Sequence, residues 1–184
     1  MAGLFRWVVV AVVLGSLSVP TQAVDFEKVG MFGVGLATGV FFHELGHASL
    51  AVLNGGKVEG IQFSETHVTG LPSNEAAQWM LLGGYIFQSA ATEVIIENKE
   101  WHDNAFALGW MSVGLYADLS NPIQYYFFGK RDNDLGLYEK AGGNPVIPAI
   151  LMTTYAGWTI YRMFNQTDIP LYVTKDMLGI TIKF

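Results

Sequence analysis

The chain has 184 residues, enough for one domain; 51% are hydrophobic, 14% are charged, and the formal net charge is −6. Globular domains usually carry about 25% charged residues, so this chain lacks the charges of an ordinary soluble surface, and we expect a lipid bilayer as part of its solvent. The balance of 10 basic against 16 acidic residues argues against a nucleic-acid partner. Because the chain has no cysteine, disulfides, thiolate metal sites and cysteine nucleophiles are excluded.

The first 23 residues have the pattern of a secretory signal peptide. Arg6 supplies the positive start, residues 7–19 are apolar, and Thr21-Gln22-Ala23 forms a small-residue cleavage site. An uncleaved anchor helix is the alternative. We therefore expect a signal peptide over residues 1–23 and a single helical membrane domain over residues 24–184, in an exported, multi-pass membrane protein.

Four apolar stretches follow, and they predict an all-α membrane protein. They cover residues 30–53, 76–96, 104–128 and 146–164. A membrane-spanning helix needs about 17 to 25 mostly apolar residues, and the first, second and fourth stretches meet this requirement. The third fits only with a bend at Pro122, since proline disfavours helix in the residue before it. Buried helices of a soluble all-α domain are the alternative interpretation.

Two segments have the alternating pattern of strands. After Gly55-Gly56, residues 57–69 mix apolar and polar side chains, which predicts a short β-hairpin at the membrane surface. Near the C-terminus, every second residue from Leu178 to Phe184 is apolar, which predicts one terminal strand.

The motif His43-Glu44-Leu45-Gly46-His47 lies inside the first apolar stretch. Residues i and i+4 share one face of a helix, so His43 and His47 can both direct a ring nitrogen at one metal ion. Glu44 is close enough to act on a water molecule without being a ligand. Zinc is the expected cofactor, with two nitrogens, one carboxylate oxygen and an open position. A metal-free motif satisfied by hydrogen bonds is the alternative, although such groups cost several kcal/mol in an apolar stretch unless something compensates.

The residues before the motif indicate which way its face points. Gly35, Gly39, His43 and His47 are spaced by four, so small side chains precede the two histidines along one ridge. Small residues let helices approach closely in lipid, and we expect this ridge to face another helix. A similar stripe of Gly84, Gln88 and Thr92 predicts hydrogen bonds between helices.

A third protein ligand is required, and several carboxylates qualify: Glu93, Asp118, Asp132 and Asp134. Asp134 also begins a short helical pattern, where capping the helix N-terminus is its alternative role. The residues alone do not choose between these candidates. The other two histidines, His67 and His102, are expected to lie on the surface.

Residues 42–48, together with residues 51–58, resemble the zinc-helix segment of the site-2 protease family of intramembrane metalloproteases. The resemblance implies that a β-ribbon follows the zinc helix and that an aspartate far downstream, near an Asn-Pro element, completes the site. Here Asn121-Pro122 precedes Asp132 and Asp134, neither of which is followed by glycine as in the family pattern. By position the resemblance favours Asp134 as the third ligand, with Glu93 as its main rival.

The resemblance also implies a function, that of a zinc metalloendopeptidase acting inside or at the edge of the bilayer. Glu44 would take a proton from water that the metal activates, and Asn121 is a candidate donor to the oxyanion. The ribbon at residues 57–69 would pair with a membrane-associated protein or peptide substrate as an added strand. The alternatives are a non-catalytic metal-binding or structural membrane protein, and a soluble periplasmic zincin-like domain.

Overall fold

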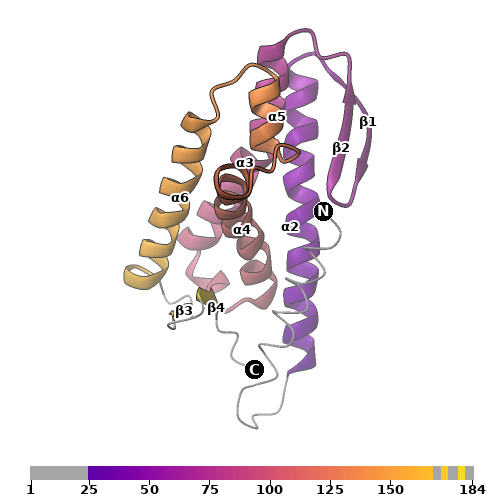
Figure 1. Ribbon diagram of the computed structural model, residues 1–184. Coiled ribbons are helices and arrows are strands. Elements are labelled where there is room, and N and C mark those ends of the chain that lie inside the picture. The colour runs from indigo at the N-terminus through magenta and orange to yellow at the C-terminus, as the bar shows by residue number, and fades with distance from the viewer. Residues whose placement is uncertain (1–24, 168–170, 174–177, 181–184) are drawn as a thin grey trace.

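The computed structural model describes residues 25–167, 171–173 and 178–180, so the predicted signal peptide lies outside the described residues. The described part is mostly helical (Figure 1). Its long helices are α2 (Phe26–Leu53), α3 (Asn74–Glu97), α4 (Ala105–Phe128) and α6 (Val146–Asn165). The short elements are the 3₁₀ turn η1 (Lys99–Trp101) and α5 (Asp134–Lys140).

Polar side chains fix the start of several helices. Asp25, Ser73 and Asn104 accept hydrogen bonds from first-turn N–H groups of α2, α3 and α4. In α5 the same role belongs to Asn133, whose Oδ1 accepts from the N–H of Gly136 at 2.9 Å. Asp134 is therefore not the cap but the first residue of the helix, so its carboxylate is free for other partners.

Close backbone contacts at glycines hold α2 between α3 and α4. A Cβ atom at Gly46 would overlap the carbonyl oxygen of Gly83 in α3, and one at Gly35 would overlap that of Phe106 in α4. Gly35, Gly39, His43 and His47 are all buried, so the predicted ridge does face neighbouring helices.

The third apolar stretch, which was expected to fit a membrane-spanning helix only with a bend at Pro122, forms one helix. The helix α4 continues through Pro122 and ends at Phe128, followed by Gly129, which adopts a left-handed conformation with φ 63°. A proline inside a helix removes one backbone hydrogen bond, here the one that residue 122 would donate to the carbonyl of Asp118. The two turns beyond Pro122 bring the end of α4 towards α5, and Asn133 binds the carbonyl of Asn121.

The predicted hairpin is confirmed. Strands β1 (Lys57–Gln62) and β2 (Glu65–Thr69) pair antiparallel, with Ile61 opposite Thr66 and an irregularity between Val58 and Gly60. The hairpin lies alongside the C-terminal half of α2 (Figure 1). At the other end of the chain, β3 (Leu171–Val173) pairs with β4 (Leu178–Ile180), so the expected terminal strand has a partner strand.

Two described helices, α2 and α3, are long and apolar enough to cross a membrane by length and composition. The helices α4 and α6 fall short of the same test. Of the four predicted apolar helices, two are therefore supported as possible membrane spans. Large apolar side chains are nevertheless exposed on all four long helices, among them Phe41, Trp79, Tyr116 and Leu151. Such surface is unusual for a protein surrounded by water alone.

Candidate metal centre

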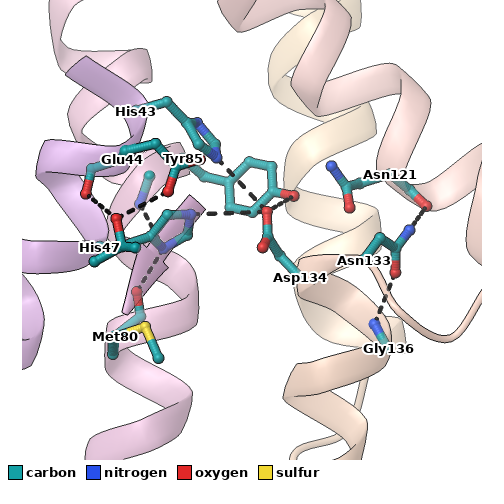
Figure 2. A network of polar contacts seen from close by, with 11 residues as sticks. His43, Glu44, His47, Met80, Tyr85, Asn121, Asn133, Asp134 and Gly136 are labelled. Atoms are coloured by element: carbon teal, nitrogen blue, oxygen red, sulfur yellow. Dashed lines mark hydrogen bonds and ion pairs between the residues drawn. The ribbon is translucent and has the colours of Figure 1, made fainter. Parts of the chain in front are cut away.

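Two histidines and one aspartate from distant parts of the chain converge between α2, α3 and α5 (Figure 2). The Nε2 atoms of His43 and His47 lie 3.6 Å and 3.8 Å from Oδ2 of Asp134. One possible ligand atom from each of the three residues lies within 4.8 Å of the others. Both histidines are buried, so the cluster is shielded from most of the surrounding solvent.

The donor set and its spacing suit a small divalent ion. A tetrahedral zinc ion bound at 2.0–2.1 Å requires donor atoms about 3.3 Å apart. The two histidine–aspartate separations exceed this value by only a few tenths of an ångström, a gap that small side-chain rotations can close. Two imidazole nitrogens and one carboxylate oxygen also match the ligand chemistry of catalytic zinc sites.

Met80 orients the ring of His47. Its carbonyl oxygen lies 2.8 Å from Nδ1 of His47 (Figure 2). The backbone nitrogen of Gly84 approaches the same atom at 3.4 Å. Because the contact with Met80 is much shorter and a carbonyl can only accept, it favours a proton on Nδ1. This leaves the lone pair on Nε2, which faces Asp134 and would bind a metal. The Nδ1 atom of His43 is buried and has no hydrogen-bond partner among the described residues.

Gly84 forms the wall of the site on α3. A Cβ atom there would lie 2.6 Å from Nε2 of His47 and 2.6 Å from Cε1 of His43, and would overlap Nε2 of His43. Any larger residue would therefore fill the space into which the two ring nitrogens point. The absence of a side chain at this position keeps room for an ion.

Tyr85 supports the aspartate. Its hydroxyl donates to Oδ2 of Asp134 at 3.0 Å, and its ring packs edge-on against His43 with 5.2 Å between ring centroids. Burial alone would raise the pKa of Asp134, but His47, His43 and the Tyr85 hydroxyl together lower it to about 2. The carboxylate is thus ionised at neutral pH, as metal binding requires.

Glu44 lies beside the cluster, on the same helix as the histidines. Its side chain is buried, and its Oε2 accepts a hydrogen bond from the Thr66 hydroxyl of β2 at 2.9 Å. The same hydroxyl lies 3.0 Å from the backbone carbonyl oxygen of Glu44. The hairpin therefore contacts the residue that the motif marks as a proton acceptor.

Asn121 contacts the site indirectly. Its carbonyl oxygen accepts from Nδ2 of Asn133, the residue before Asp134 (Figure 2). The side-chain Oδ1 of Asn121 is buried and has no hydrogen-bond partner among the described residues. The contact that the structure gives Asn121 thus anchors the start of α5, where Asp134 begins.

The remaining carboxylate candidates lie in other surroundings. Glu93 binds Arg162 of α6 at 2.5 Å through Oε2, and accepts a hydrogen bond from the Tyr155 hydroxyl at 2.9 Å through Oε1. Asp118 is buried in α4, whereas Asp132 is exposed just before α5. None of the three belongs to the cluster of possible metal ligands found in the described part of the chain.

The structure separates the two other histidines. His67 is exposed on β2, as expected. His102 is buried, so its predicted surface location is wrong; its Nε2 lies 3.0 Å from the carbonyl oxygen of Ile96, because η1 folds the loop back against the end of α3. The predicted stripe is confirmed at Gln88, which donates to the carbonyl oxygen of Trp110 in α4 at 3.0 Å.

Sequence reasoning missed the parts played by Met80, Tyr85 and Thr66. A backbone carbonyl such as that of Met80 carries no sequence signal. Tyr85 follows Gly83-Gly84 in the middle of an apolar stretch, where a buried hydroxyl needs a partner, and this was the one available hint. Thr66 is an ordinary hairpin residue by composition.

Comparisons with known proteins bear on the same residues. A family model described as Peptidase M50B-like matches residues 7–119, more than half of the chain. The matched range contains the histidine motif, the hairpin and α3, and it ends before Asn121 and Asp134. No curated protein and no solved structure gives a significant match.

Proposed function

Because the chain belongs to the peptidase M50B-like family, we propose that it is a zinc-dependent, membrane-embedded endopeptidase. The family match agrees with the resemblance to site-2 proteases and supports peptidase activity in general. The proposal of a zinc-dependent active site rests on one observation, the convergence of His43, His47 and Asp134 beside Glu44.

In this proposal His43, His47 and Asp134 hold the ion. The choice of Asp134 is supported by its contacts with both ring nitrogens. The rival ligand Glu93 has both carboxylate oxygens engaged by Arg162 and Tyr155, and freeing it would leave a buried arginine without that partner. The chemistry that zinc supplies in such a site is activation of a water molecule and polarisation of the scissile carbonyl.

Glu44 acts as general base and then as general acid. Its carboxylate accepts a proton from the attacking water and passes it to the leaving amine nitrogen as the peptide bond breaks. The carboxylate is adjacent to the ligands and is held by Thr66. Asn121 stays a predicted oxyanion donor. The contact that the structure gives it, with Asn133, involves its backbone carbonyl oxygen and not its side chain.

The membrane location is proposed from the family and from α2 and α3. The helix α2 has 28 residues and is about 42 Å long at 1.5 Å per residue, whereas the hydrocarbon core is about 30 Å thick. His43 and His47 lie about 15 Å and 9 Å from its last residue, so if α2 spans the bilayer the site would lie inside or at the edge of that core. Carbonate extraction of membranes tests this, because a soluble zincin-like domain would be released into the supernatant.

The proposed substrate is a membrane-associated protein or peptide. A scissile bond inside a helix must be unwound before water can reach it, and pairing with the hairpin as an added strand would expose it. This role of residues 57–69 rests on the family analogy and on the position of the hairpin next to Glu44.

The first experiment measures zinc per chain in detergent-purified protein. Wild type should carry about one zinc ion; His43→Ala and Asp134→Ala should lose it, whereas Glu93→Ala should keep it. Asp132→Ala is the matched control, since Asp132 is a neighbouring but exposed aspartate. Absence of zinc from reconstituted wild type would overturn the proposal, and loss of zinc from Glu93→Ala alone would replace Asp134 by Glu93.

The second experiment distinguishes an enzyme from a non-catalytic metal protein. Cleavage of fluorescein-labelled casein and of a labelled apolar helical peptide is compared between wild type and Glu44→Gln. The variant should keep zinc and lose cleavage, because the amide cannot accept the proton. Equal cleavage by both proteins, or none by zinc-loaded wild type, would contradict the peptidase proposal.

A further inference from the structure

The hairpin and the helix α2 share a polar contact at Glu44. The Thr66 hydroxyl lies 2.9 Å from the side-chain Oε2 of Glu44 and 3.0 Å from its backbone carbonyl oxygen. Thr66 lies in β2, opposite Ile61 of β1, and is 22 residues away from Glu44 in the chain. Among the described residues, Thr66 is the hydrogen-bond donor that the structure gives to the Glu44 carboxylate.

The chemistry of a hydroxyl determines what this contact can do. A threonine hydroxyl has one hydrogen, so it donates to the carboxylate or to the carbonyl, but not fully to both. A bond to an ionised carboxylate is the stronger of the two. Donation to Oε2 therefore holds one oxygen of Glu44 and leaves Oε1 available to accept a proton from water.

We propose that Thr66 is a positioning residue for Glu44, through which the hairpin sets the orientation of the general base. This inference rests on the proposed peptidase function for its catalytic consequence, but the contact itself does not depend on it. Without the hydroxyl the carboxylate loses its donor and can take other rotamers. A segment that binds to the hairpin and displaces β2 would also change the position of Glu44.

The chain offers a control threonine in α6, outside the hairpin and away from the histidines. The Thr153 hydroxyl donates to the backbone carbonyl oxygen of Ala149 at 2.8 Å. The test set is Thr66→Val, which keeps the shape of the side chain but removes the hydroxyl, Thr66→Ser, which keeps the hydroxyl, and Thr153→Val.

Steady-state cleavage of labelled casein separates positioning from binding. Thr66→Val should lower kcat by about ten- to a hundredfold, the range expected for losing a hydrogen bond to a charged group, with KM and zinc content unchanged. Thr66→Ser should stay within about threefold of wild type, and Thr153→Val should be unaffected. An unchanged kcat in Thr66→Val, or a failure of Thr66→Ser to restore it, would overturn the proposal.

A second measurement needs no substrate and no metal. Amide hydrogen exchange over residues 57–69 of the metal-free protein should become faster in Thr66→Val and in Glu44→Ala, and no faster still in the double variant, because both changes remove one bond. Additive effects would refute the contact. If wild type cleaves nothing, the peptidase proposal fails, while this exchange result still decides whether Thr66 holds Glu44.

Discussion

Replacing Gly84 by alanine should remove metal binding while leaving the protein folded. The new Cβ would lie 2.6 Å from Nε2 of His47 and 2.6 Å from Cε1 of His43, whereas ordinary contact begins at about 3.5 Å. Each ring would have to move by at least about 0.9 Å, several times the tolerance of about 0.2 Å in a zinc–ligand distance. We therefore expect zinc affinity to fall by at least about a hundredfold.

The fold should tolerate this change. Alanine in place of glycine favours a helix by about 1 kcal/mol, and overpacking costs about 1–3 kcal/mol, so the net loss of stability should be no more than about 2 kcal/mol. Competition with a chromophoric chelator measures the affinity, and far-UV circular dichroism reports the helix content. Gly157→Ala is the control, because nothing lies within 4 Å of a Cβ in that α6 position.

Two results would refute this reasoning. One is zinc affinity in Gly84→Ala within about threefold of wild type, which would mean that the metal does not sit against α3. The other is equal loss of affinity in Gly157→Ala, which would indicate a general effect of helix stiffening. The neighbouring Gly83→Ala should behave differently, since its Cβ would overlap the backbone of Gly46 and separate α2 from α3, lowering Tm together with zinc binding.

Three further substitutions test the supports of the site. Tyr85→Phe removes the hydroxyl that holds Asp134 but keeps the ring against His43, so chelator competition should show zinc affinity lower by about tenfold. Asn133→Ala removes the cap of α5 and its tie to α4; thermal unfolding should show a loss of about 1 kcal/mol, with weaker zinc binding, and unchanged binding would argue against Asp134 as a ligand. Glu93→Gln should lower Tm by weakening the Arg162 pair while zinc per chain stays at the wild-type value.

Local patterns accounted for much of the fold. The apolar stretches predicted the positions of the four long helices to within a few residues, because helix formation and burial follow the composition of neighbouring residues. The hairpin was predicted for the same reason. The helix α4 continues through Pro122, and the burial of His102 depends on a turn that no periodicity signals.

The candidate site likewise has one part that local sequence predicted and one part that it did not. His43, Glu44 and His47 belong to one stretch of helix, so the spacing of the residues is sufficient to place two ring nitrogens on one face. The sequence by itself thus determined the helix and its histidine face. The residues alone did not choose among the four candidate carboxylates, because all are acidic residues far along the chain, and only the family resemblance favoured Asp134 over Glu93.

Only the tertiary structure decided which carboxylate approaches the histidines. Arg162, 69 residues beyond Glu93, engages that side chain, while the Asn133 cap at the start of α5 directs Asp134 towards the pair. The helices α2 and α3 cross closely at Gly46 and Gly83. This crossing places Gly84 against the two histidine rings and the Tyr85 hydroxyl next to Asp134. Such contacts depend on how helices pack over long separations in sequence, and helix packing is a property of whole surfaces that local residue patterns do not encode.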